Sequence, residues 1–260
     1  MDNLPQELIN RIVYYLKRYE GQSQYPVRRR QSREPSNFQL YATLSRPWKK
    51  AVELVTFHSL GIKSNELSHF HAIMTGNRRK FLTNLSYEIL LPEYCKEARD
   101  RVESDDEKRL NDESFTQSIY NLFSILKVWE SEGVQTALRL ELPHKNAFSP
   151  TDLHFSNKVQ RRIEMTNRER GKDIFERRFE MSFLRLLEPS LLLNLANLQR
   201  LCIRGNNVRK LAPSIGPGLA GSLPNLKDIF WEFGDCDNQP ASLRSDNRIA
   251  FVEALKLNPL

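Results

Sequence analysis

The stretch Leu198-Gln199-Arg200-Leu201-Cys202-Ile203-Arg204-Gly205-Asn206 decides the fold that we expect for most of this chain. Leu201 and Ile203 alternate with polar or small residues, which is the period of a short strand that turns one face inward. Asn206 suits the turn that follows, because an asparagine side chain can hydrogen-bond to nearby backbone groups. The stretch therefore predicts one strand and one turn of a structural unit.

Related stretches occur elsewhere in the chain, at irregular intervals. The clearest of them is Leu223-x-x-Leu226-x-x-Ile229-x-Trp231, and weaker ones are Leu85-x-Tyr87-x-Ile89, Leu138-x-Leu140-x-Leu142 and Leu60-Gly61-Ile62. The pattern resembles the leucine-rich repeat, which implies strands stacked side by side with helices or long insertions on the outer side. We therefore expect an α/β fold in which residues 61–260 form an irregular leucine-rich-repeat-like solenoid.

Two helices and two charged stretches complete the expected solenoid. Apolar residues at helical spacing predict a core helix from Phe115 to Trp129, capped by Asp112 or Ser114, and a last helix from Asn247 to Leu257. The charged stretches 96–112 and 158–180 are expected to be exposed, because they are too polar to be buried. No polar capping unit follows the last helix, so we expect the solenoid to be incomplete and to lack its C-terminal cap.

Residues 1–60 predict a separate helical module. Pro5 suits the first turn of a helix, since its missing N–H would be unpaired there. Apolar residues then recur at three- and four-residue intervals and predict one amphipathic helix: Leu8, Ile9, Ile12, Val13 and Leu16. A second helix is expected to begin near Asn37 to Gln39 and to continue through Val52, with Pro47 breaking or kinking it. Helices this short need each other, the following domain or a partner to cover their apolar surface.

The pattern of this module resembles an F-box. The matching residues are Leu4, Pro5, Leu8, Ile12 and Leu16, then Leu44, Ser45, Arg46 and Trp48, then Phe57 and Leu60. The basic loop 21–36 is longer than the family usually has, and Pro47 inside the second helix is a further departure. Further features resemble a large group of filamentous-fungal F-box proteins with leucine-rich-repeat-like bodies. These features are Arg78-Arg79, Leu91-Pro92-x-Tyr94 and the helix from Phe115.

The resemblance implies a partner and a role. The N-terminal helices would bind the adaptor subunit of a cullin-RING (SCF-type) ubiquitin ligase through Leu4, Pro5, Leu8, Ile12, Leu16, Leu44 and Trp48. The repeat face would bind a protein substrate, and no reaction would occur on this chain. A second interpretation stays open, in which the N-terminal helices cap the solenoid and the protein is a ligase-independent interaction scaffold.

Composition and charge narrow the other possibilities. The formal net charge is +7, but the cluster Arg28, Arg29, Arg30 and Arg33 lies in a polar loop, and the basic residues of 161–178 are mixed with acidic ones. The first cluster has only Tyr25 nearby, and no recognition motif surrounds either cluster, so nucleic acid is disfavoured as a partner; the first cluster is expected to be a soluble loop or a nuclear-import signal. No apolar run reaches the roughly 20 residues of a membrane span.

The expected location is the cytoplasm or the nucleus. The amino terminus lacks the apolar core of a signal peptide, because Glu7, Asn10 and Arg11 interrupt it. The chain has three cysteines, Cys95, Cys202 and Cys236. An odd number at wide spacing fits reduced thiols better than a disulfide framework.

Motifs for catalysis or cofactor binding are weak. Gly216-x-Gly218-x-x-Gly221 formally matches a dinucleotide-binding glycine pattern, but Pro213 and Pro217 suit a loop better than a phosphate-binding helix start. His69 and His71 could lie on one side of a strand and hold a metal, yet no third ligand accompanies them at a recognisable spacing. We therefore predict a non-catalytic protein with no cofactor and no metal.

Overall fold

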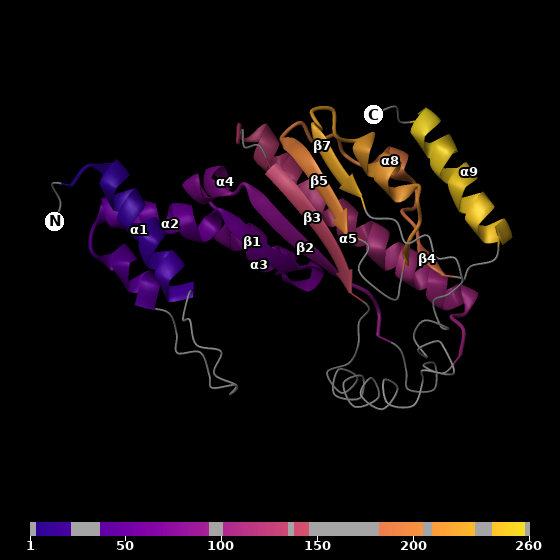
Figure 1. Ribbon diagram of the computed structural model, residues 1–260, viewed down its shortest axis with the longest axis horizontal. Coiled ribbons are helices and arrows are strands. Elements are labelled where there is room, and N and C mark those ends of the chain that lie inside the picture. Colours follow the sequence, from indigo (N-terminus) through magenta and orange to yellow (C-terminus); the bar gives the residue numbers. More distant parts are fainter. Residues whose placement is uncertain are drawn as a thin grey trace.

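The computed structural model describes residues 4–21, 37–93, 101–134, 138–145, 182–204, 210–231 and 241–257. A helical module at one end consists of α1 (Gln6–Gly21), the 3-10 helix η1 (Asn37–Thr43) and α2 (Arg46–Phe57). A parallel sheet follows, with helices packed against it (Figure 1). Of the sequence expectations, Asn206, most of the basic loop 21–36 and the stretch 158–180 lie outside the described residues.

The main sheet has five strands whose spatial order is their order in the chain. They are β1 (Ser59–Lys63), β2 (Asn84–Leu90), β3 (Leu138–Lys145), β5 (Leu198–Arg204) and β7 (Asp228–Trp231), and every neighbouring pair is parallel. Each connection must therefore cross back from the end of one strand to the start of the next. The expected α/β class is confirmed, and each of the five apolar stretches predicted as strands contributes a strand to this sheet, although only Asp228–Trp231 of the stretch that starts at Leu223 is a strand.

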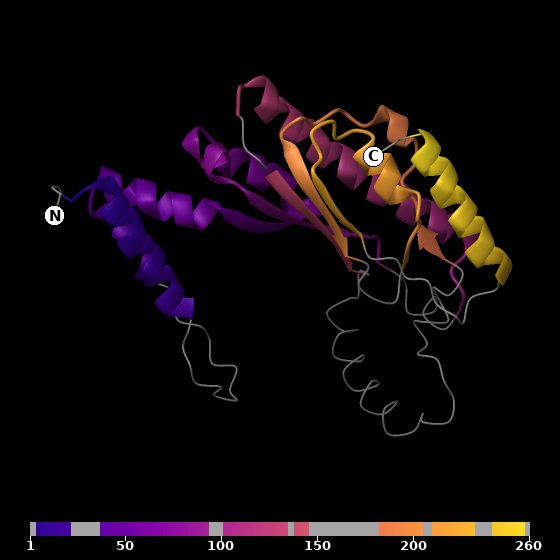
Figure 2. The same ribbon diagram turned by 45° about the horizontal axis from the view of Figure 1, so that its top comes forward.

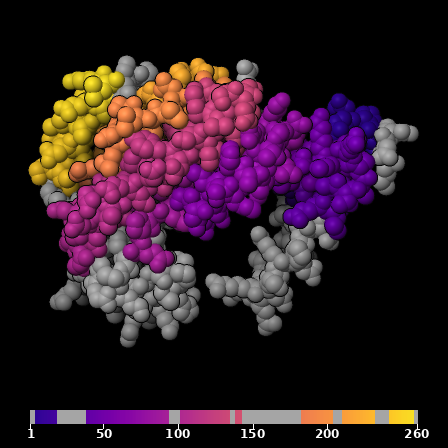
Figure 3. Space-filling model, turned by 180° about the vertical axis from the view of Figure 1, so that it is seen from behind, coloured from indigo at the N-terminus to yellow at the C-terminus, as the bar shows by residue number. Residues whose placement is uncertain are grey.

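The smaller elements lie in these connections. A second, two-stranded parallel sheet pairs β4 (Phe183–Leu184) with β6 (Lys210–Leu211). The described helical elements in these connections are η2 (Ser64–Glu66), α3 (Leu67–Ile73), α4 (Asn77–Phe81), α5 (Asp105–Ser131), η4 (Pro189–Leu191) and α8 (Ile215–Ala220), and α9 (Ala241–Leu257) follows the last strand. Figure 2 shows α5 running behind the strands. Figure 3 views the molecule from behind, and its colours show that the elements follow one another along the long axis in the order of the chain.

One face of the sheet builds the main core. Alternate residues of β2 are fully buried, namely Leu85, Tyr87 and Ile89, while the residues between them are half-buried. The apolar side of α5 packs in the same cluster through Phe115, Ile119, Leu122, Phe123, Leu126 and Trp129. The predicted core helix is thus confirmed, because its apolar stripe meets the inward side chains of the strands.

Helix α5 begins earlier than the sequence pattern indicated. Its N-cap is Ser104, whose hydroxyl accepts a hydrogen bond from the Glu107 N–H, while the Glu107 carboxylate accepts one from the Ser104 N–H. This reciprocal pair satisfies two backbone donors at the helix start. The expectation that Asp112 or Ser114 caps the helix is therefore wrong.

The prediction that the whole stretch 96–112 is exposed is also wrong for part of it. Glu103, Asn111 and Asp112 are buried, at 3%, 1% and 7% exposure. Asn111 Nδ2 donates to Glu103 Oε1 at 2.7 Å, and Asp112 Oδ1 accepts from the Arg185 N–H at 2.9 Å. Polar side chains tolerate burial when such partners are present, and one of these partners, Arg185, comes from a distant part of the chain.

A row of polar side chains on α5 binds the backbone of residues 185–196. Asp112 and Thr116 accept from the N–H groups of Arg185 and Leu187, Tyr120 and Lys127 donate to the carbonyls of Glu188 and Asn194, and Glu130 accepts from Ala196 N–H. These bonds satisfy backbone groups of a segment with little regular structure. They fix the segment that leads into β5.

The last helix, α9, is longer than expected and starts at Ala241. Phe251 contacts the ring of Trp231 edge-on, with 5.4 Å between the ring centroids. Ile249 and Val252 are about half exposed and Leu257 is largely exposed, so this side of the helix is apolar and open among the described residues. Among the described helices, none combines the length and apolar character needed to cross a bilayer.

Candidate functional site

The break at Pro47 sets the shape of the N-terminal module. The single second helix expected from Asn37 to Val52 is two elements, η1 and α2, and Pro47 lies in the first turn of α2. Ser45 precedes this turn in an extended conformation. A proline fits a first turn because no helical partner exists there for its missing N–H. The sequence expectation of a break at this residue is confirmed.

The module has a small core of its own. Ile9 and Val13 of α1 meet Phe38 of η1 and three residues of α2, namely Trp48, Ala51 and Val52. The rings of Tyr41 and Trp48 lie 6.1 Å apart. This cluster is separate from the core under the sheet. Burial of the six side chains explains why these three short elements hold together.

Two hydrogen bonds tie α1 to α2. Gln6 Nε2 donates to the Pro47 carbonyl at 3.1 Å, near the start of both helices. Lys17 Nζ donates to the Val55 carbonyl at 2.7 Å, near the end of both. Partial burial lowers the pKa of Lys17, since desolvation disfavours the charged form. Because the ties join start to start and end to end, the two helices run in the same direction.

The apolar stripe predicted on α1 divides into two. Ile9 and Val13 are fully buried, whereas Leu8 and Ile12 are 47% and 39% exposed. Leu4 just ahead of the helix is also exposed, and Tyr15 extends this outer side by one turn. Residues spaced by three or four positions share one side of a helix. Leu4, Leu8, Ile12 and Tyr15 therefore form an exposed apolar strip, which we call the outer stripe.

The seven residues predicted to bind a partner occupy three kinds of position. Leu4, Leu8 and Ile12 lie in the outer stripe, and Leu44 is exposed next to η1. Pro5 is exposed at the start of α1, where its carbonyl accepts from the N–H groups of Leu8 and Ile9. Leu16 is half-buried against the module core, and Trp48 lies inside that core. The exposed residues of this set can touch a partner directly, namely Leu4, Pro5, Leu8, Ile12 and Leu44.

Two exposed residues extend the candidate site beyond those predicted. Tyr15 follows Ile12 by three positions, which is a helical signal that the sequence contains. Leu40 of η1 is 62% exposed, so that η1 and the residue after it carry two exposed leucines. The sequence placed Leu40 and Leu44 on a regular helix, where their spacing would suggest a common buried side.

The second candidate surface is the face of the sheet turned away from the main core, which we call the uncovered face because no described helix packs on it, although one of its residues, Cys202, is buried. The strand register places two rows across it: Ser59, Asn84, Arg139, Arg200 and Asp228, then Gly61, Ser86, Glu141, Cys202 and Phe230. Arg139 pairs with Glu141 at 3.1 Å, and Arg200 pairs with Asp228 at 2.9 Å. The surface is thus polar with paired charges, and it ends on the exposed ring of Phe230.

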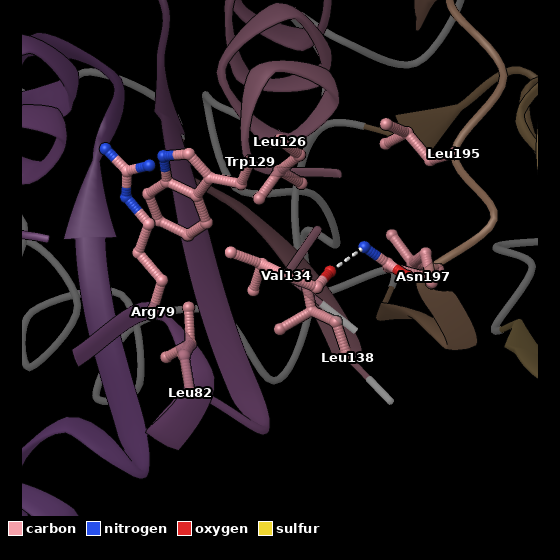
Figure 4. A pocket seen from close by; sticks show the side chains of 9 residues that line it. Arg79, Leu82, Leu126, Trp129, Val134, Leu138, Leu195 and Asn197 are labelled. Carbon is pink, nitrogen blue, oxygen red and sulfur yellow. Dashed lines mark hydrogen bonds between the residues drawn. The ribbon is translucent and has the colours of Figure 1, made fainter. Parts of the chain in front are cut away.

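The cavities in the described residues do not suggest a small-molecule site. One, lined by Arg79, Trp129, Asn197 and several leucines, has a volume of about 20 Å³, which is room for roughly one water (Figure 4). A wider hollow of about 410 Å³ lies between the start of α5 and β4, and charged side chains such as Lys108 and Arg185 line it. The first space is mostly apolar but far too small for a ligand, and the second lacks the mostly apolar lining that is usual for a ligand pocket.

The histidine pair and the glycine pattern occupy positions that do not suit metal or nucleotide binding. His69 and His71 are exposed on α3, and on a helix this spacing points them apart instead of to one side. Gly216 and Gly218 lie inside α8, packed against Trp231 and Pro189. Within the described part of the chain, no three His, Cys, Asp or Glu residues are grouped as metal ligands. Cys202 is buried, and Cys95 and Cys236 lie outside the described residues.

Comparison with known proteins gives no relative. No protein-family model, no curated protein and no solved structure matches this chain.

Proposed function

We propose that this protein is the substrate-recognition subunit of an SCF-type cullin-RING ubiquitin ligase, without catalytic activity of its own. The outer stripe of α1 and the exposed leucines of η1 would bind the ligase adaptor. The uncovered sheet face, as the inner surface of a leucine-rich-repeat-like solenoid, would bind a protein substrate. The expected location is the cytoplasm or the nucleus.

The observation that carries the proposal is the outer stripe. The module already buries Ile9 and Val13 in its own core, yet Leu8 and Ile12 on the same helix, and Leu4 just ahead of it, remain exposed. Contiguous exposed apolar side chains commonly mark a surface that another protein covers. An amphipathic helix that offers residues at three- and four-residue spacing fits an apolar groove of a partner. These positions are also those at which the sequence resembles an F-box.

The arrangement of the sheet supports the second half of the proposal. Parallel strands in chain order, with helices on one side, are the arrangement expected of a leucine-rich-repeat-like solenoid. Its uncovered face offers paired charges and the exposed Phe230, which suits a protein surface better than a small molecule.

The test is co-purification of the full chain with the ligase adaptor. Leu8→Asp places a charge in the outer stripe and should abolish saturable binding while the helix content stays unchanged. Tyr14→Asp is the matched control, because Tyr14 is exposed on α1 but lies off the stripe. Adaptor binding by Leu8→Asp at the wild-type level would refute the assignment of this helix.

One observation favours the alternative, a ligase-independent scaffold whose N-terminal helices cap the solenoid. Helix α2 leads directly into β1 and contacts α4, so the module covers that end of the sheet. If the folded wild-type chain does not bind the adaptor at all, this second function becomes the better account.

A further inference from the structure

The junction between the N-terminal module and the sheet is short. Helix α2 ends at Phe57 and β1 begins at Ser59, so His58 alone lies between them. The two apolar cores on either side are separate clusters. The orientation of the module relative to the sheet therefore depends on the contacts that cross this junction: Phe57 packs against the core under the sheet, and α2 also contacts β1 and, more extensively, α4.

Arg78 of α4 holds the module side. Its Nε and Nη2 donate to Glu53 Oε1 of α2 at 3.2 and 3.0 Å, and its Nη1 donates to the Ile73 carbonyl at 3.1 Å. The guanidinium also lies over the ring of Phe57, 4.9 Å from its centroid. An arginine can make all these contacts at once because its donors form a planar fork that also stacks on aromatic rings.

Arg79 holds the sheet side. Its Nε donates to the Met74 carbonyl at 2.6 Å, and its Nη1 forms an ion pair with Glu132 just after α5. Its guanidinium lies over the ring of Trp129, 5.3 Å from the centroid. Figure 4 shows this side chain alongside the Trp129 indole. Only 11% of the Arg79 side chain is exposed, but Glu132 is 51% exposed, so water screens the ion pair more than the contacts with Trp129 and the Met74 carbonyl.

The two arginines face apart because consecutive helical residues differ by about 100° around the axis. One short helix thus contacts α2 through the first arginine and α5 through the second. Two backbone hydrogen bonds also hold the junction itself. The His58 carbonyl accepts them from the N–H groups of Thr83 and Asn84 at 3.0 and 3.1 Å.

The geometry points to Arg78 and Arg79 as a two-sided clasp that fixes the N-terminal module at one orientation relative to the sheet. The inference goes beyond the proposed function, because it holds whichever partner binds α1. For any protein that joins one partner at the module to another at the sheet, such a clasp sets the distance and angle between the two. Arg78 and Arg79 are then positioning residues that touch neither partner.

The clasp is tested by measuring the distance between the two parts in the full-length chain. Nitroxide labels are placed on α2 at Lys50 and on α5 at Ser124, both exposed, through non-natural amino acids so that the native cysteines remain. Pulsed electron spin resonance then gives the distance distribution. Wild type should show one narrow distribution, and Arg78→Ala should show a broad or shifted one.

Two further variants separate positioning from general loss of structure. Glu53→Gln keeps the shape of the Arg78 partner but removes its charge, and it should also broaden the distribution. Lys80→Ala, an exposed residue of the same helix, should leave it at the wild-type width. Far-UV circular dichroism and thermal unfolding should show Arg78→Ala folded, since the module core and sheet core do not include it.

The outcomes are decisive in either direction. A wild-type distance distribution in folded Arg78→Ala would overturn the clasp, and so would equal broadening in Lys80→Ala. Arg79→Ala should broaden the distribution as Arg78→Ala does. If Arg79→Ala fails to fold, Arg78→Ala and Glu53→Gln still decide the question. Adaptor binding plays no part in the readout, so failure of the clasp and failure of the proposed function are distinguishable.

Discussion

The indole ring of Trp231 lies directly against the backbone of Gly216, where any side chain would collide with it. Gly216 belongs to the buried helix α8, and Trp231 ends the edge strand β7. The ring of Phe251 on α9 packs against the same indole. The Trp231 ring therefore joins α8, β7 and α9. Its contact with Gly216 explains a glycine that the sequence pattern had associated with a nucleotide.

Replacing Gly216 with alanine should destabilise the protein. The added methyl must displace the Trp231 ring, and overpacking of this kind costs about 1–3 kcal/mol. Urea unfolding followed by tryptophan fluorescence measures the loss. Gly61→Ala is the control, because nothing lies within 4 Å of a Cβ at that position. An equal loss in both variants would mean that the ring contact is not the cause.

Trp48→Ala should also lower stability, although the sequence placed this residue in a binding surface. Its side chain is 6% exposed in the core of the module, and truncating a buried tryptophan costs about 3–5 kcal/mol. Trp48→Phe should cost much less, since the indole Nε1 has no hydrogen-bond partner to lose among the described residues. Thermal unfolding checks both variants. A negligible loss in Trp48→Ala would contradict its burial.

Asp112→Ala should loosen the segment that leads into β5. The substitution leaves the partly buried Arg185 N–H without its partner, and a hydrogen bond to a charged group contributes about 1.5–3 kcal/mol. Hydrogen exchange should rise at Arg185 and Leu187 and stay unchanged in β2. The neighbouring exposed variant Glu113→Ala removes a surface ion pair with Arg109 and should change exchange little. Wild-type exchange at Arg185 in Asp112→Ala would contradict the role of this bond.

Tyr87 should make the protein less stable in alkali. Its hydroxyl donates to the Ser118 carbonyl at 3.0 Å, and burial raises the pKa of Tyr87 to about 12. The ordinary tyrosine pKa is about 10, so the folded state holds this proton more tightly than the unfolded state. The resulting stability is fully present below about pH 10 and is lost as the pH rises towards about 12.

Urea unfolding at several pH values tests this expectation. Tyr87→Phe should lose about 1 kcal/mol at neutral pH, from the missing hydrogen bond, and should show a flatter decline above about pH 10. Tyr14→Phe, at an exposed site, should keep the wild-type pH dependence. The same steep alkaline decline in Tyr87→Phe as in wild type would assign the effect to other groups.

The sheet could be predicted from sequence because its signal is local. Leu85, Tyr87 and Ile89 alternate with polar residues inside one strand, and no distant partner is needed to recognise that period. The N-terminal part of α5 could not be predicted in this way. Asp112 and Asn111 look like surface residues, and their burial depends on bonds to Arg185 and Glu103.

The candidate site shows the same limit. The spacing of apolar residues on α1 predicted one stripe, but this stripe is wide enough for one part to be buried in the module core and another part to stay exposed. Which part faces α2 and which part stays exposed depends on how η1 and α2 pack, and periodicity carries no information on that. Leu8 and Ile9 are adjacent in the chain, and yet only the second is buried.

The order of the strands also bears on how the sequence can vary. Because each strand pairs with its neighbours in the chain, extra residues between two strands lengthen a connection without changing any pairing. The chain between β3 and β5 already contains extra residues of this kind, since β4 lies there and pairs with β6 outside the main sheet. Lengthening a loop costs free energy only slowly, by about 0.6 kcal/mol for each doubling. Insertions and deletions between strands can therefore accumulate over evolution while the paired charges on the sheet keep their places.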